Sequence, residues 1–197
     1  GLGDVYKRQE MNRVGLVIDM SHSGQRSTLE AIEHSRRPIA ITHANPAFWH
    51  PALRNKSDAV LSALGESGGM LGLSLYPHHL KGGSACTLAD FCEMAARTIE
   101  LVGPDQLGIG TDLCQDQPDT VVEWMRVGRW TKAIDFGEGS AETPGFPPMP
   151  EWFQDNRHFG AIEAGLRNTG LSENEVAGVM GGNWLRFFEQ NFGPENG

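Results

Sequence analysis

The stretch Gly15–His43 reads GLVIDMSHSGQRSTLEAIEHSRRPIAITH, and it decides the fold. It contains two short runs rich in Val and Ile, at Gly15–Met20 and Pro38–Thr42. Continuous apolar runs of this length suit strands that are buried on both faces, as in parallel sheets. His22 follows the first run and His43 follows the second. The pattern predicts two buried strands, each with a histidine beyond its carboxyl end.

A helix is expected between these two strands. Ser27 and Glu30 have the spacing of a capping box, and the helix is expected to end near Ser35. Parallel strands joined by such a helix bring both carboxyl ends to the same edge of a sheet, so we expect His22 and His43 to face one pocket. Two neutral imidazoles at one rim are typical of part of a metal site. The alternative is that each histidine only caps its own strand by hydrogen bonding.

The composition sets limits on size and partners. The chain has 197 residues, of which 39% are hydrophobic, enough for one domain or for part of a larger one. A net charge of −9 with scattered basic residues argues against nucleic-acid binding and against a polybasic membrane patch. No apolar run approaches the roughly 20 residues that a membrane-spanning helix needs. Cys86, Cys92 and Cys114 lack a C-x-x-C spacing, which argues against a disulfide framework and a thiolate zinc site.

The N-terminal segment is treated separately. Gly1–Gln9 shows no clear periodicity, and we expect it to be a non-native scar in front of a domain that spans 10–197. The natural chain would then begin further upstream, so a signal peptide is left open. We expect a cytoplasmic location.

Two further polar residues are expected at the rim that holds the histidines. Arg54 lies in the aromatic loop Ala44–Lys56, where a fixed guanidinium suits a carboxylate through two parallel hydrogen bonds. The alternative is a solvated surface arginine. Asp112 follows an expected strand at Leu107–Gly110, and it could accept a proton, orient a metal-bound water or bind an ammonium group. The alternative is a structural carboxylate that caps the next turn.

Another strand is expected at Met70–Leu75, and a pair of histidines follows it. We do not assign this pair to a metal, because adjacent residues after a strand point in different directions. His79 is a candidate for substrate contact, and His78 is expected in an exposed loop. The segment Gln115–Asp155 is rich in proline and predicts an irregular, lid-like loop with one helical piece near Val121–Val127.

Helices are expected at Ser57–Ser67, after two further capping residues and near the C-terminus. The capping residues are Thr87 and Ser172, and the last helix is expected at Asn183–Phe192. Their apolar positions recur at helical spacing, which predicts that they pack against the sheet.

Several of these motifs together resemble the membrane dipeptidase (renal dipeptidase) family of zinc metallopeptidases. They are IDMSH ending at His22, ITH ending at His43, LRN around Arg54, GIGTD ending at Asp112, and the closing GNWLRFF. The resemblance covers roughly residues 10–191. It implies an α/β fold that is the C-terminal half of a TIM-type (β/α)8 barrel of the metal-dependent hydrolase type, with about four parallel strands and flanking helices.

The resemblance also implies a function and roles for residues. It implies a zinc-dependent dipeptidase with two zinc ions in the full-length enzyme, and a dipeptide as its substrate. His22 and His43 would be metal ligands, Arg54 would fix the C-terminal carboxylate of the substrate, and Asp112 would be catalytic. Remaining ligands, a His-x-Asp pair and a bridging carboxylate, would come from the first half of the barrel, and no His-x-Asp segment occurs here.

We therefore expect the chain alone to be inactive. The alternatives are a related metal-dependent amidohydrolase that acts on a cyclic or other amide, and a non-catalytic remnant that kept the fold. A half-barrel would expose strand edges, which favours self-association, for example as a homodimer.

Overall fold

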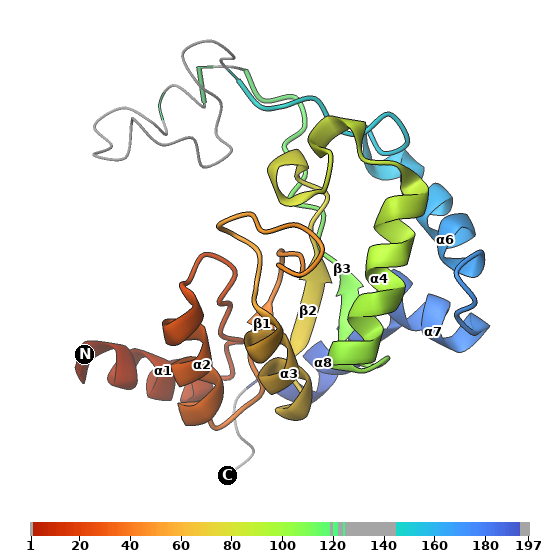
Figure 1. Ribbon diagram of the computed structural model, residues 1–197. Coiled ribbons are helices and arrows are strands. Elements are labelled where there is room, and N and C mark those ends of the chain that lie inside the picture. The colour runs from red at the N-terminus through yellow and green to blue at the C-terminus, as the bar shows by residue number, and fades with distance from the viewer. Residues whose placement is uncertain (1, 119, 122–123, 125–144, 194–197) are drawn as a thin grey trace.

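A computed structural model describes residues 2–118, 120, 121, 124 and 145–193. Three short parallel strands lie at its centre, in the order β1 (Ala40–Ile41), β2 (Met70–Leu73) and β3 (Leu107–Ile109). Ala40 pairs with Met70 in the first ladder, and Leu71 pairs with Leu107 in the second. The strands run in the same direction, so the loops that follow them gather at one end of the sheet (Figure 1).

The first expected strand is reduced to a single bridge. Asp19 pairs with Ala40 in an isolated parallel bridge, and the backbone N–H of Met20 donates to the carbonyl of Ala40 at 2.9 Å. The sheet of the described residues therefore has three strands, where the sequence predicted about four. In the described part of the chain this segment forms a bridge with β1 alone, and Gly15, at its start, has a left-handed φ of +75°.

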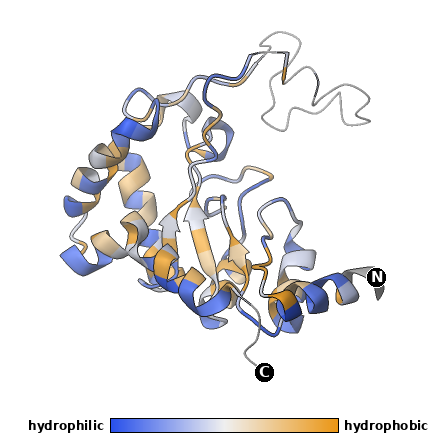
Figure 2. Ribbon diagram, turned by 180° about the vertical axis from the view of Figure 1, so that it is seen from behind, coloured by the Kyte–Doolittle hydropathy of each residue, from blue (hydrophilic) through white to orange (hydrophobic). Residues whose placement is uncertain are grey.

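Helices cover the two faces of the sheet unequally. Helices α3 (Asp58–Glu66) and α4 (Leu88–Val102) lie over the front face in Figure 1. Seen from behind in Figure 2, helix α8 (Asn183–Asn191) runs along the lower part of the opposite face. Since side chains alternate along a strand, Ile41 joins the larger apolar cluster, whereas its neighbour Ala40 joins a smaller one with Phe187 of α8.

The capping predictions are confirmed for two helices. The side-chain oxygens of Thr87 and Ser172 accept hydrogen bonds from the third backbone N–H beyond them, at the starts of α4 and α7. Ser57 caps α3 in the same way. The remaining helices that the structure describes are α1 (Leu2–Val14), α2 (Gln25–His34), α6 (Phe159–Arg167) and α7 (Glu173–Ala177). Helix α1 therefore runs through most of the segment Gly1–Gln9.

The predicted start of α2 is wrong. The helix begins at Gln25 with Gly24 as its N-cap, and Ser27 lies inside the first turn. Gly24 has extended backbone angles and makes no side-chain cap. Glu30 pairs with Arg26 at 2.8 Å on the helix surface and does not reach back to a free backbone N–H.

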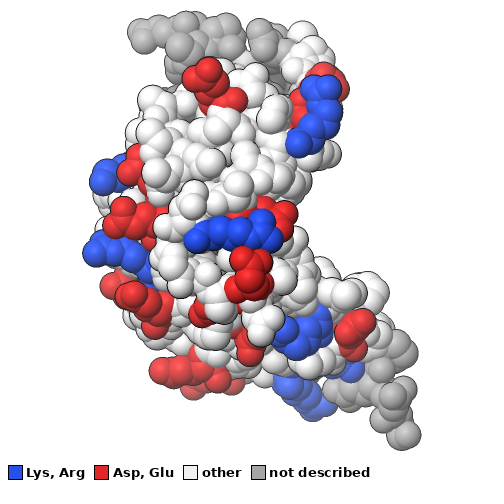
Figure 3. Space-filling model, turned by 90° about the vertical axis from the view of Figure 1, so that its right-hand side faces the viewer, with Lys and Arg blue, Asp and Glu red and all other residues white. Residues whose placement is uncertain are grey.

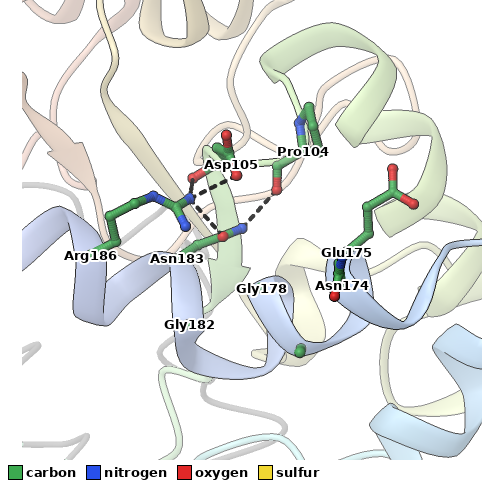
Figure 4. Close-up of a pocket in the computed structure, with 9 residues that line it drawn as sticks. Pro104, Asp105, Asn174, Glu175, Gly178, Gly182, Asn183 and Arg186 are labelled. Atoms are coloured by element: carbon green, nitrogen blue, oxygen red, sulfur yellow. Dashed lines mark hydrogen bonds and ion pairs between the residues drawn. The ribbon is translucent and has the colours of Figure 1, made fainter.

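The start of α8 is tied to the segment that precedes β3 (Figure 4). The side-chain amide of Asn183 donates to the carbonyls of Pro104 and Leu107, each at 2.7 Å. Arg186 forms an ion pair with Asp105 at 2.9 Å. A φ of +149° at Gly181 breaks the chain direction between α7 and α8. These contacts anchor α8 to the edge of the sheet where the strands begin, opposite to the loops that carry the histidines.

The expected lid-like loop falls largely outside the described residues, and so does most of the helical piece near Val121–Val127. Its described end packs on the turn before α4. The indole N–H of Trp152 donates to the carbonyl of Cys86 at 2.7 Å, and Ser84 donates to the carbonyl of Pro148 at 2.5 Å.

The charged surface shows acidic and basic side chains close to one another on the face drawn in Figure 3. Ion pairs between surface residues include those of Arg167 with Glu163 and Glu173. A search of the described residues for a helix with the length and apolar character of a membrane span finds none.

Candidate metal centre

His22 and His43 meet beyond the carboxyl ends of the first two parallel segments. Their Nε2 atoms are 2.9 Å apart, and their ring centroids are 5.0 Å apart with an interplanar angle of 65°. His22 lies in the turn that leads into α2. His43 is the second residue after β1, directly after Thr42. The parallel arrangement therefore brings two imidazole nitrogens to one point, as the sequence predicted.

Asp112 lies at the same point. Its Oδ2 atom is 4.0 Å from Nε2 of His43, and its side chain is 33% exposed. The backbone of Asp112 has a φ of 52°, in the left-handed region that few residues other than glycine adopt. This conformation turns the chain directly after β3. The carboxylate thus stands at the rim, within reach of both the histidine pair and solvent.

Arg54 places its guanidinium against both imidazoles. Nη1 contacts Nδ1 of His22, and Nη2 is 3.3 Å from Nε2 of His43. Burial, followed by the charge of Arg54 and the proximity of His43, lowers the pKa of His22 below its usual value. The imidazole of His22 is therefore held in its neutral form, which is the form that binds metals.

His79 is buried next to the loop that carries Arg54. The residue is 3% exposed, and its Nδ1 atom is 2.8 Å from the hydroxyl oxygen of Ser74. Its carbonyl accepts hydrogen bonds from the side-chain amides of Asn45 and Asn55, each at 3.0 Å. Burial, with smaller contributions from nearby cationic groups, lowers the pKa of His79 to about 3. His78 is exposed, as expected for a loop residue.

Two charged residues that support the site were missed in the sequence. Lys56 is 1% exposed, and its Nζ atom donates to the carbonyls of Met20 and Ser23 at 3.0 and 2.7 Å, on either side of His22. The carboxylate of Asp19 accepts hydrogen bonds from Ser21 and Thr42. A charged residue inside an apolar run was a signal for Asp19. No signal of this kind marks Lys56, because its partners are backbone carbonyls more than 30 positions away.

The histidine pair suits one position of a zinc site. Two nitrogens that bind the same tetrahedral zinc at about 2.0–2.1 Å lie about 3.3 Å apart. The Nε2 atoms are 2.9 Å apart, so a small opening of the pair would admit the ion. Within the part of the chain that is described, no group of three His, Cys, Asp or Glu side chains is arranged to hold a metal. The described residues therefore fit part of a zinc site.

Comparison with known proteins assigns the chain to a family. Residues 8–134 match the profile of the membrane dipeptidase family, peptidase family M19. The chain belongs to this family. Among curated proteins, the chain is 25% identical over 179 residues to Dipeptidase aclJ of Aspergillus oryzae. It is 24% identical over 182 residues to Dipeptidase 3 of Rattus norvegicus.

The chain spans about a third of the length of these curated relatives. The two matches cover 90% and 92% of this chain, but 35% and 31% of the relatives. The described fold thus corresponds to a part of the longer relatives.

Solved structures show the same relation for the fold. An amidohydrolase from Pseudomonas aeruginosa matches with a TM-score of 0.84 and 29% identity, over 95% of this chain and 56% of that chain. A dipeptidase described as a metallopeptidase of family M19 matches with a TM-score of 0.74 and 21% identity, over 96% of this chain and 47% of that chain. The predicted fold class is confirmed: the chain is α/β and forms about half of a (β/α)8 barrel of the metal-dependent hydrolase type.

Proposed function

We propose that this chain is part of a zinc-dependent dipeptidase, which hydrolyses the peptide bond of dipeptides. The observation that carries the proposal is the 2.9 Å separation between the Nε2 atoms of His22 and His43, with Asp112 and Arg54 beside them. One structural relative, a metallopeptidase from Rhodobacter sphaeroides, was solved with a phosphinate mimic of the dipeptide L-Ala-D-Ala. That likeness supports a short peptide as the substrate of this chain.

Each rim residue has a role in this proposal. His22 and His43 hold zinc through their Nε2 atoms, and the full-length enzyme binds two zinc ions. Zinc, when bound, polarises the peptide carbonyl and lowers the pKa of a water molecule to about 7. Arg54 binds the C-terminal carboxylate of the dipeptide with two parallel hydrogen bonds, which limits the substrate to short peptides. Asp112 takes up and returns the proton.

Arg54 must change partners for this role. A histidine that binds zinc through Nε2 carries its proton on Nδ1, and a protonated Nδ1 cannot accept a hydrogen bond from Arg54. In the structure Nη1 of Arg54 contacts Nδ1 of His22. Zinc binding would therefore release this end of the guanidinium, which becomes available for the substrate carboxylate.

We propose that the chain alone does not hydrolyse dipeptides. A hydrolytic zinc site uses three protein ligands as a rule, and the described residues supply two imidazoles as ligands, because Asp112 has the role of proton transfer. The domain at 10–197 would need further ligands from elsewhere in the family's barrel. His79 stays a proposed substrate contact, which would have to reach the substrate through its Nε2 atom.

Zinc binding by the purified 197-residue chain tests the proposal. Equilibrium dialysis should show zinc bound by the unmodified chain and lost in His22→Ala and in His43→Ala. His34→Ala is the matched control, because His34 is 56% exposed in the last turn of α2. Unchanged zinc binding in His22→Ala and His43→Ala would support a non-catalytic remnant.

A second function is favoured by one comparison. The Pseudomonas aeruginosa relative with a TM-score of 0.84 is described as an amidohydrolase. The parent protein could therefore act on a cyclic or other amide with the same zinc centre. Assays of the full-length protein on dipeptides and on cyclic amides separate the two functions.

A further inference from the structure

The carboxylate of Asp19 is the centre of a hydrogen-bond network behind His43. Oδ1 accepts from the backbone N–H groups of Ser21 and Thr42, each at 3.0 Å. The hydroxyl of Ser21 donates to Oδ1 at 2.6 Å, and the hydroxyl of Thr42 donates to Oδ2 at 2.7 Å. The two bonds from Thr42 therefore join the end of the first parallel segment to the end of β1, and the two from Ser21 lie within the first segment.

Oδ1 of Asp19 acts as an acceptor irrespective of any hydroxyl rotation, because both backbone N–H groups donate to it. Oδ2 is an acceptor as well when Asp19 is ionised, and the hydroxyl of Thr42 then donates to it. Burial by itself would raise the pKa of Asp19, but the hydrogen bonds from Ser21 and Thr42 outweigh burial and lower it. Asp19 is thus an ionised carboxylate, which can accept hydrogen bonds from its neighbours but cannot donate one.

The acceptor role of Asp19 determines where the hydroxyl protons lie. Ser21 and Thr42 each have one hydroxyl proton, and both protons point to Asp19 at 2.6 and 2.7 Å. The contact between the two hydroxyl oxygens is longer, at 3.1 Å. Each hydroxyl oxygen is then left as an acceptor for His43. The oxygen of Ser21 accepts from the backbone N–H of His43 at 3.1 Å.

The same argument applies to the imidazole ring of His43. Its Nδ1 atom is 2.9 Å from the hydroxyl oxygen of Thr42. Because the hydroxyl of Thr42 already donates to Asp19, the donor in this contact must be an N–H group at Nδ1 of His43. The ring then carries its single proton on Nδ1, and its Nε2 atom keeps a lone pair that faces His22.

We propose that Asp19 is a positioning residue that sets the tautomer of His43. The carboxylate of Asp19 accepts the hydrogen bond from the hydroxyl of Thr42, so the oxygen of Thr42 accepts a hydrogen bond from Nδ1 of His43. The lone pair on Nε2 of His43 then points into the rim. In ordinary metal sites a carboxylate or a carbonyl contacts the histidine directly. Here the threonine hydroxyl transmits the effect from Asp19 to His43. The use of this lone pair for zinc rests on the proposed function, whereas the tautomer does not.

Long-range ¹H–¹⁵N NMR of the metal-free chain, labelled with ¹⁵N-histidine and measured at pH 8, tests the tautomer directly. His43 is assigned with a His43→Gln variant. In the unmodified chain Nδ1 of His43 should be protonated and Nε2 should not. Thr42→Val removes the hydroxyl at nearly constant volume and should abolish this preference, whereas Thr42→Ser should restore it. Asp19→Asn should shift the ring toward the form with its proton on Nε2, because the Thr42 proton is then free to turn to Nδ1.

Zinc affinity is the second readout. It should fall about 10–100-fold in Asp19→Asn and in Thr42→Val, the range typical for loss of a partner of a metal-binding histidine. Thr42→Ser should stay close to the unmodified chain. Asp58→Asn is the matched control for the loss of one carboxylate, because Asp58 is exposed in the first turn of α3.

The two readouts separate the inference from the proposed function. Two results would overturn the role of Asp19. One is a proton on Nε2 of His43 in the unmodified chain, and the other is a tautomer of His43 that does not change from the unmodified chain in Thr42→Val and in Asp19→Asn. If the unmodified chain binds no zinc but shows the expected tautomers, the zinc site is wrong and the role of Asp19 stands. The pair Thr42→Val and Thr42→Ser keeps the test decisive if Asp19→Asn does not fold.

Discussion

His22, His43 and Arg54 share contacts in which each nitrogen can play only one part. Nη1 of Arg54 donates to Nδ1 of His22, which leaves the proton of that ring on Nε2. Nε2 of His22 then donates to Nε2 of His43 at 2.9 Å, where the lone pair set by Asp19 accepts it. In the structure the guanidinium therefore holds His22 in the tautomer that does not bind zinc through Nε2. Zinc and Arg54 compete for this ring.

Arg54→Met should tighten zinc binding by the 197-residue chain and weaken substrate binding by the full-length enzyme. The substitution removes a positive charge beside the imidazoles, which repels the cation. It also removes the group proposed to bind the substrate carboxylate. Since hydrogen bonds to charged groups contribute about 1.5–3 kcal/mol, KM for dipeptides should rise about 10–100-fold. Arg26→Met is the control, because Arg26 is 92% exposed on α2. An unchanged KM would remove Arg54 from the substrate site.

His79 should make the chain less stable in acid. The pKa of His79 is about 3 in the folded chain because the residue is buried, and about 6.5 in the unfolded chain. Its neutral form contributes full stability above about pH 6.5, and this contribution is lost as the pH falls from about 6.5 to 3, because only the unfolded chain binds the proton. Urea unfolding of the unmodified chain and of His79→Gln should show that the advantage of the unmodified chain shrinks over this interval. His34→Gln should show no such convergence.

At the scale of the elements, the strands approach one another at glycines. A Cβ atom at Gly72 would lie 2.0 Å from the carbonyl oxygen of Thr42, and one at Gly110 would lie 1.7 Å from the same oxygen. Thr42 carries the hydroxyl that orients His43, so these glycines let the backbone behind the site pass close to β2 and to the end of β3. The position of the candidate metal centre thus depends on the absence of side chains at these two places.

Gly110→Ala should destabilise the chain strongly, whereas Gly160→Ala should not. The first substitution places a methyl group against backbone, which costs about 1–3 kcal/mol or more when the neighbour cannot move. The second lies in α6, where nothing is within 4 Å of the new Cβ, and it should stabilise the helix by about 0.5–1 kcal/mol. The free energy of unfolding in urea measures both. Equal stability of the two variants would contradict the close approach.

At the scale of the molecule, the described fold has edges and apolar side chains that are uncovered. β1 pairs with β2 on one side and has only the bridge at Asp19 on its other side, and β3 is the opposite edge of the described sheet. Helix α8 and the turn after it expose apolar side chains, with Leu185 63% and Phe192 61% exposed. Unpaired edges and apolar patches favour association with another chain.

The 197-residue chain should therefore self-associate, with a homodimer as the simplest form. Sedimentation velocity over a range of concentrations should show a rising average mass. Leu185→Lys combined with Phe192→Lys should reduce this association, because the two charges replace exposed apolar surface. Leu53→Lys is the control, since Leu53 is 79% exposed in a loop far from α8 in sequence. A monomer at all concentrations would contradict the prediction.

The sequence by itself determined what depends on local pattern. Apolar runs and capping residues predicted the parallel units, and the positions of His22, His43 and Asp112 after those units predicted that they meet, because parallel strands end at one edge. The motifs around these residues were sufficient to identify the family that the comparison confirmed.

Only the tertiary structure decided which partner each polar group takes. Asp19 and Thr42 are 23 positions apart, and Lys56 contacts carbonyls more than 30 positions away, so no local pattern reports these bonds. The first expected strand is likewise only a single bridge to β1. Its own apolar residues do not encode which segments lie beside it. Hydrogen bonds between distant segments form only where packing brings donor and acceptor within about 3 Å, and that distance is a property of the folded chain.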